Sequence, residues 1–344
     1  MSDALKAPFP WFGGKSRVAA LVWSRFGPVA NYVEPFFGSG AVLLGRPDFD
    51  AADPTVETVN DKDGFVANFW RAVQHDPEAV AHWADWPVNE NDLHARHIWL
   101  VGIRDEFVAR LEGDPDYYDA QVAGWWCWGI CCWIGGGWCS GSGPWSVEEG
   151  QLVHLGNKGQ GVNGRLVHRQ LVHLGNKGQG VNGRLVHLGN AGKGEMGLRQ
   201  WMETLCARLA RVRVCCGDWS RVCGPSVTYK HGLTAVLLDP PYSAEAGRDE
   251  SIYREEDLTV AHAVREWCLT NGDNPLLRIA LCGYEGEHQM PDAWKCVPWK
   301  ASGGYGSKGN GKGRTNMVRE RVWFSPACLR GQQADLFAAP EAHA

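Results

Sequence analysis

The sequence predicts an α/β fold, with one sheet between layers of helices, because strand-like apolar runs alternate with helical patterns in both halves of the chain. Residues 31–34 and 56–60 are short runs that end in loops, and residues 64–74 follow with helical spacing. In the second half, residues 235–238 form an apolar run of strand length. The other predicted elements are helices over residues 16–26, 198–212 and 257–269 and strands over residues 212–216, 276–282 and 321–324.

A long insertion divides this predicted domain into two parts. The first part covers residues 1–84, the second covers residues 195–330, and the tail at residues 331–344 is expected to be flexible. The insertion, residues 85–194, begins with a polar and largely helical stretch at residues 85–118. A chain of 344 residues is long enough for a divided domain of this kind.

Tryptophans gather in the insertion, among glycines and cysteines. Such side chains either anchor the insertion to a hydrophobic core or wedge between the base pairs of a duplex. We favour the core, because large aromatic side chains are usually buried. The tryptophans in question are Trp125, Trp126, Trp128, Trp133 and Trp138.

The most informative feature is Asp239-Pro240-Pro241-Tyr242, which follows the predicted strand at residues 235–238. The two prolines end that strand and stiffen the loop beyond it. In open α/β sheets, ligands bind at the carboxyl ends of the strands. A carboxylate that can hold an amino group, beside a ring that can stack on a base, suits chemistry on a nucleobase.

A second motif lies at residues 31–42, where the sequence predicts a strand, a glycine loop and a helix. Gly38 and Gly40 allow the backbone to turn tightly and to approach a ligand closely. Asp61 ends the next predicted strand, where an acid commonly binds ribose hydroxyls. The two motifs together indicate a nucleoside-binding site.

These motifs resemble those of the Dam-type DNA adenine-N6 methyltransferases of bacteria and phages, which use S-adenosylmethionine. The resemblance implies a Rossmann-like methyltransferase sheet flanked by helices, with the insertion as a target-recognition region. The matching segments occur in the family's order and leave residues 85–194 unmatched. They are Trp11-Phe12-Gly13-Gly14-Lys15, Glu34-Pro35-Phe36-Phe37-Gly38-Ser39-Gly40, Gly217-Asp218-Trp219, Asp239-Pro240-Pro241-Tyr242 and a closing strand within residues 316–325.

The resemblance implies a catalytic role for Asp239, Pro240, Pro241 and Tyr242. Asp239 and the Pro240 carbonyl would accept hydrogen bonds from the adenine amino group, and Tyr242 would stack on the flipped base. Methyl transfer would be direct, with no covalent enzyme intermediate. The implied cofactor residues are Glu34, Phe36, Gly38 and Gly40 around the methionine moiety, Asp61 at the ribose, Asp218 at the adenine amino group, and Trp11 and Lys15 closing the pocket. Gly14 and Trp219, in the same motifs, are implied cofactor-binding residues as well.

Two glycine-rich basic segments suit contact with DNA phosphates. Residues 151–200 hold seven basic side chains and one acid, and residues 300–321 hold six and one. Residues 151–168 recur unchanged as residues 170–187, a 19-residue repeat with short Leu-Val-His runs that predict strands. The alternative is a duplicated, solvated surface loop. The candidate DNA-binding residues are Lys158, Arg165, Lys177, Arg184, Lys308, Lys312 and Arg314.

The composition limits the classes of protein that fit. A net charge of −5 argues against a wholly basic DNA-coating protein. The chain has no long apolar run and no signal-peptide pattern, so we expect a cytoplasmic protein that does not enter a membrane. The 12 cysteines lack paired Cys-x-x-Cys spacing, which favours reduced thiols over a metal site. We expect a monomer without an obligatory protein partner.

Parts of the sequence also suggest other functions. Gly14-Lys15-Ser16 resembles the end of a phosphate-binding P-loop, but Phe9 stands where that motif needs glycine. Lys15 could also be a simple surface lysine. Closer in chemistry, the substrate could be the exocyclic amine of cytosine or a base in RNA, or the chain could be a catalytically silent DNA-binding relative.

Overall fold

The structure is a computed structural model. It describes residues 5–11, 13–47, 49–50, 52, 54–133, 137–139, 145–148, 151–154, 197–241, 260–299 and 319–330.

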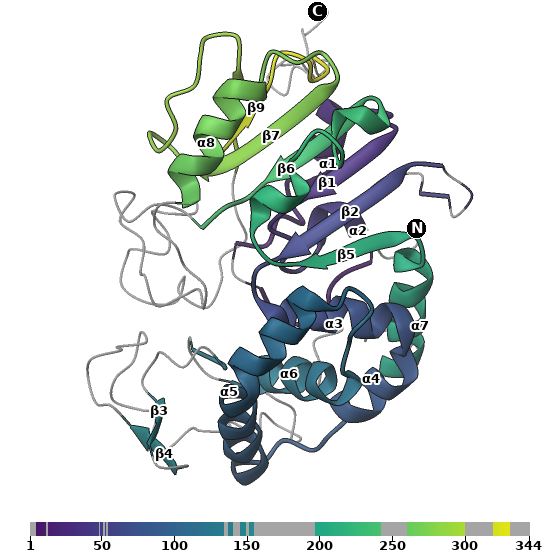
Figure 1. The fold of residues 1–344 in the computed structure, drawn as a ribbon, viewed down its shortest axis with the longest axis vertical. Coiled ribbons are helices and arrows are strands. Elements are labelled where there is room, and N and C mark those ends of the chain that lie inside the picture. The colour runs from purple at the N-terminus through teal and green to yellow at the C-terminus, as the bar shows by residue number, and fades with distance from the viewer. Residues whose placement is uncertain are drawn as a thin grey trace, which may run out of the picture.

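A seven-stranded sheet forms the centre of the molecule, with the strand order β5-β2-β1-β6-β7-β9-β8 (Figure 1). The first five strands in that order are parallel, and β9 is antiparallel to both of its neighbours. The strands are β1 (Asn31–Glu34), β2 (Val56–Asp61), β5 (Val212–Cys216), β6 (Thr234–Leu238), β7 (Leu277–Tyr284), β8 (Lys295–Pro298) and β9 (Glu320–Phe324). The predicted α/β class is therefore confirmed.

The strand order reverses between β1 and β6. From β1 the chain proceeds outward through β2 to β5, and then returns to the other side of β1 to form β6 and β7. The loops after β1 and β6 therefore leave the sheet in opposite directions and open a crevice at the carboxyl edge. Ligands of open α/β sheets bind at such a reversal.

Helices cover both faces of the sheet, and alternate side chains of each strand enter two hydrophobic cores. In β6, Ala235 and Leu237 belong to the core under most of the helices, whereas Val236 and Leu238 belong to the core on the other face. The first core is lined by α1 (Ala19–Phe26), α2 (Ala41–Leu44), α3 (Gly64–His75) and α7 (Leu198–Leu209). The second is lined by α8 (Val260–Asn271) and the short 3₁₀ helix η4 (Trp219–Val222), with η5 (Tyr229–His231) nearby in the chain.

A group of three helices extends the first core away from the sheet (Figure 1). They are α4 (Pro77–Ala84), α5 (Glu90–Gly113) and α6 (Ala120–Cys132), and α6 packs against both α3 and α4. A hairpin of β3 (Trp145–Glu148) and β4 (Gln151–His154) lies beside α5. β4 is the first Leu-Val-His run of the repeat, so the prediction of a strand there is confirmed.

The tryptophans of the insertion belong to the core, as favoured from the sequence. Trp126, Trp128 and Trp138 are buried, and Trp125 and Trp133 pack against the same core while partly buried. The glycines in α6 make this packing possible. A Cβ atom on Gly129 would overlap the Trp138 ring, and one on Gly124 would overlap Trp83.

The predicted elements differ from the observed ones mainly at their ends. The first helix begins at Ala19 rather than at residue 16. The helix predicted at residues 257–269 ends at Asn271 and is observed from Val260, and residues 257–259 lie outside the described residues. Each cysteine is a free thiol. In the described part of the chain, no helix is both long and apolar enough to cross a membrane. The tail at residues 331–344 and most of the repeat lie outside the described residues.

Candidate active site

Three carboxylates from three strands gather at the carboxyl edge of the sheet, beside the reversal in strand order. Glu34 ends β1, Asp61 ends β2 and Asp239 follows β6 directly. Both Asp239 and Asp61 raise the pKa of Glu34 electrostatically, which indicates their proximity. The topology thus brings together acids that are far apart in the sequence.

The loop after β1 is held in a conformation that requires glycine. Gly38 has φ +47°, and a Cβ atom there would lie 2.3 Å from Nε1 of Trp11. Its N–H donates to Oδ2 of Asp61 at 2.8 Å, and its carbonyl accepts from Nε1 of Trp70 at 2.8 Å. Gly40 has φ +61° and lies against the Phe37 ring. Both glycines are therefore structurally required, and Trp11 lies directly against the loop.

Asn60 ties this loop to the loop after β5, a role that the sequence had not suggested. Its buried Nδ2 donates to the Pro35 carbonyl at 3.0 Å and to the Gly217 carbonyl at 2.9 Å. The two loops carry Phe36 and Trp219, whose rings stack with centroids 6.3 Å apart at 26°. The sequence feature that could have revealed this role is an amide side chain at the end of a buried strand, next to the predicted ribose ligand Asp61.

Two predicted cofactor ligands make local contacts with the backbone. The exposed Asp218 caps η4 by accepting from the Ser220 N–H at 2.9 Å. Besides binding Gly38, Asp61 accepts from the Asp63 N–H through Oδ1 at 2.9 Å. These contacts fix both carboxylates at the starts of the loops that follow β5 and β2.

Lys15 pairs with Asp239, with 2.8 Å between Nζ and Oδ2. The same ammonium donates to the Gly13 carbonyl at 2.9 Å and lies 5.5 Å from the centre of the Trp299 ring. Burial alone would lower the pKa of Lys15, but Asp239 and Glu320 outweigh it and hold that pKa above its usual value. Lys15 is therefore a buried cation, which rules out a simple surface lysine.

The environment of Asp239 leaves its carboxylate accessible. Its side chain keeps 23% of its exposure, whereas that of Lys15 keeps 6%. Within the described part of the chain, Lys15 is its one ion-pair partner, and Oδ1 has none. Pro240 is buried and Pro241 is half-buried, which fixes the direction in which the loop leaves β6. Asp239 can thus accept a hydrogen bond from a group that enters from solvent.

Glu34 is buried, and its pKa is raised to about 8. Burial is the main cause, a hydrogen bond from Tyr32 opposes it, and Asp239 and Asp61 add to it. A buried carboxyl group with such a pKa gains most from a neighbouring positive charge.

The remaining predicted site residues are placed as follows. Gly14 is half-buried, with its Cβ position 3.5 Å from the Trp11 carbonyl oxygen. Tyr242 and all seven candidate DNA-binding residues lie outside the described residues; these seven are Lys158, Arg165, Lys177, Arg184, Lys308, Lys312 and Arg314. In the described residues, no group of three or more potential ligands could hold a metal ion.

Comparison of the sequence with models of known protein families and with curated proteins found no match.

Proposed function

We propose that the protein is an S-adenosylmethionine-dependent methyltransferase that modifies the N6 amine of adenine at specific sites in duplex DNA. The observation that carries the proposal is the position of Asp239, paired with a buried lysine at the reversal of a parallel sheet, beside the glycine loop. The finer assignment of the fold as a Rossmann-like methyltransferase sheet with a target-recognition insertion is part of this proposal.

The residues at the carboxyl edge fit the cofactor. Glu34 is a buried carboxylate with no cation within ion-pair distance among the described residues, so it suits the amino group of the methionine moiety. Gly38 and Gly40 bring the backbone close, and Phe36 and Trp219 supply flat apolar surface. When bound, S-adenosylmethionine supplies an electrophilic methyl group on its sulfonium.

Asp239 and Pro240 would prepare the nucleophile. An adenine amino nitrogen is a poor nucleophile because its lone pair is delocalised into the ring. Hydrogen bonds from its two N–H groups to the Asp239 carboxylate and the Pro240 carbonyl would favour a pyramidal nitrogen. Lys15 holds Oδ2 in place, which would leave Oδ1 to accept from the incoming amine. Tyr242 would stack on the flipped base.

Recognition of the duplex belongs to the proposal as well. The seven basic residues named above would contact phosphates, and the insertion would read the bases. Such an enzyme would act as a monomer on cytoplasmic DNA, with or without a companion restriction endonuclease. The exocyclic amine of cytosine and a base in RNA are alternative substrates, and a silent DNA-binding relative is the alternative without catalysis.

The test is incubation of the purified protein with methyl-labelled S-adenosylmethionine and unmethylated duplex DNA, followed by nucleoside analysis. We expect label in N6-methyladenine, and Asp239→Ala should lose at least roughly 1,000-fold in rate while still binding cofactor. Glu203→Ala, a change at an exposed position of α7 outside the insertion, is the control and should keep full activity. Label in N4-methylcytosine would overturn the base assignment, and full activity of Asp239→Ala would overturn the mechanism.

A further inference from the structure

A buried hydrogen bond connects Tyr32 to Glu34 along one face of β1. The Tyr32 hydroxyl donates to Oε2 of Glu34 at 2.8 Å, and the tyrosine is fully inaccessible to solvent. The two residues are two apart in a strand, so their side chains lie on the same face of the sheet. Burial, followed by the charge of Glu34, raises the pKa of Tyr32 well above its usual value. The hydroxyl therefore stays protonated and remains a donor.

The short helix α2 lies beside Glu34. The backbone of Leu43 lowers the pKa of the Glu34 carboxyl group and so favours its charged form. Leu43 is in the first turn of α2, where backbone N–H groups have no partner within the helix. Glu34 thus has one donor already in place, the Tyr32 hydroxyl, and the first turn of α2 beside it.

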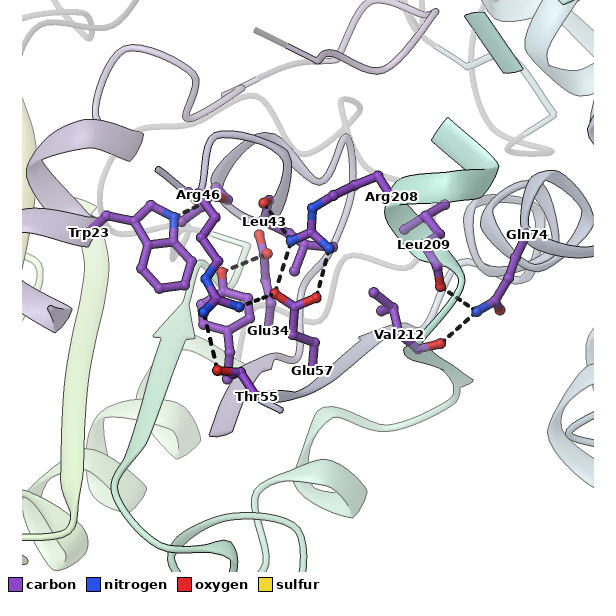
Figure 2. A network of polar contacts seen from close by, with 12 residues as sticks. Trp23, Glu34, Leu43, Arg46, Thr55, Glu57, Gln74, Arg208, Leu209 and Val212 are labelled. Atoms are coloured by element: carbon purple, nitrogen blue, oxygen red, sulfur yellow. Dashed lines mark hydrogen bonds and ion pairs between the residues drawn. The ribbon is translucent and has the colours of Figure 1, made fainter. Parts of the chain in front are cut away.

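A buried network fixes α2 (Figure 2). Nη2 of Arg208, in α7, donates to the Leu43 carbonyl at 3.0 Å. The same guanidinium holds both carboxylate oxygens of Glu57, at 2.7 and 2.9 Å. Arg46, just after α2, donates to Glu57 at 3.0 Å. The end of α2 is therefore held by Arg208 through the Leu43 carbonyl.

We propose that Tyr32 is a positioning residue, which prepares the Glu34 carboxylate to receive a cationic group of the ligand. The inference rests on the proposed function, in which that group is the amino group of the methionine moiety. Tyr32 does not touch the cofactor in this arrangement and acts through Glu34.

The arrangement predicts a particular dependence of ligand binding on pH. Glu34 must be ionised to pair with an ammonium, so binding strengthens as the pH rises toward about 8, the pKa of Glu34, over the range in which the amino group of the ligand stays protonated. Loss of the Tyr32 hydroxyl removes a contact that lowers that pKa, so the midpoint moves to higher pH. The groups that face this pair are Leu43 of α2, Asp61 and Glu57 of β2, Asp239 after β6, Cys282 of β7 and Arg208 of α7.

The experiment is calorimetric titration of the full chain with three probes, at pH values on both sides of about 8. S-adenosylmethionine and S-adenosylhomocysteine carry the amino group, and methylthioadenosine lacks it. For Tyr32→Phe, we expect roughly tenfold weaker binding of the first two probes at neutral pH. The midpoint should rise by about one pH unit, and the difference from wild type should shrink at high pH. Binding of methylthioadenosine should not change.

Two further variants keep the test decisive. Glu34→Gln keeps the shape of the side chain but cannot ionise, so its weak binding should not vary with pH even if Tyr32→Phe is poorly folded. Tyr118→Phe removes the hydroxyl of a half-buried tyrosine that stacks on His75, far along the chain from β1, and should behave as wild type.

The outcomes separate this inference from the proposed function. If the wild type binds both amino-bearing probes and Tyr32→Phe has the same pH profile, Tyr32 has no positioning role. An equal loss for all three probes at every pH would make its role purely structural and would also overturn the inference. If the wild type binds none of the probes, the proposed function fails and the inference fails with it.

Discussion

Arg208–Glu57 and Lys15–Asp239 are both ion pairs with a buried cation, but they use the carboxylate in different ways. In the first pair the two side chains keep 3% and 5% of their exposure, and the guanidinium occupies both carboxylate oxygens. In the second, the carboxylate keeps 23% and uses one oxygen. A buried carboxylate that binds protein donors through both oxygens is closed to a substrate, whereas a partly exposed one with one oxygen paired can accept a further hydrogen bond. Glu57 therefore belongs to the structural scaffold, whereas Asp239 is available to bind a ligand.

The positions of the two pairs agree with this division. Glu57 is near the start of β2 and is enclosed by α2 and α7, away from the carboxyl edge (Figure 2). Asp239 lies on that edge, at the reversal in strand order. Desolvating a charge costs free energy, and the scaffold pair offsets that cost with several hydrogen bonds. The Lys15–Asp239 pair offsets part of the desolvation cost because the Asp239 carboxylate keeps some contact with water.

The largest expected effect on stability comes from Arg208→Met. Among the described residues, the change leaves the buried Glu57 carboxylate with Arg46 as its one charged partner, and it removes the contact of Arg208 with the Phe49 ring. We expect the free energy of unfolding to fall by about 3–5 kcal/mol, measured by urea denaturation. Adding Glu57→Gln should restore part of the loss because it removes the unpaired charge. A loss below about 1 kcal/mol would contradict the scaffold role.

Lys15→Met should have the opposite profile, with a smaller loss of stability and a larger loss of activity. We expect about 1–2 kcal/mol in unfolding free energy, since Asp239 can hydrate once its partner is gone. Methyl transfer should fall by roughly 100-fold because Asp239 is no longer held in position. Denaturation and single-turnover kinetics measure the two effects separately. If the activity of Lys15→Met falls only in proportion to the fraction of folded protein, Lys15 has a structural role alone.

The sequence predicted most strands of the sheet because runs such as residues 235–238 in β6 and 279–282 in β7 are apolar over the length of a strand. It also placed Asp239 at a strand end, since that position follows from the length of the run before it. The pairing of Asp239 with Lys15 could not be predicted. Lys15 precedes β1 and Asp239 follows β6, so only the strand order brings them together.

Other features were missed for identifiable reasons. Helix α4 was not predicted, although Asp76 caps it and Pro77 occupies its first turn, a recognised signal for a helix start. Strand β8 is short and mostly exposed at the edge of the sheet, so it has no alternation of apolar residues to reveal it. The role of Tyr32 was hidden because a tyrosine in a strand is usually explained by packing alone. Its spacing from Glu34 was the available signal.

The smallest expected effect comes from Arg199→Met, which removes an arginine from the same helix as Arg208. Arg199 pairs with Glu78 and Glu203, but all three side chains are more than half exposed. Water screens such pairs, so the free energy of unfolding should change by less than about 1 kcal/mol. The same urea titration that measures Arg208→Met measures this variant. If the two variants lost equal unfolding free energy, α7 would simply be sensitive to the loss of any arginine. The hydrogen bonds of Arg208 to Glu57 would then not be needed to explain its effect. A small loss here beside a large one for Arg208→Met would assign the difference to burial and to the hydrogen bonds at Glu57.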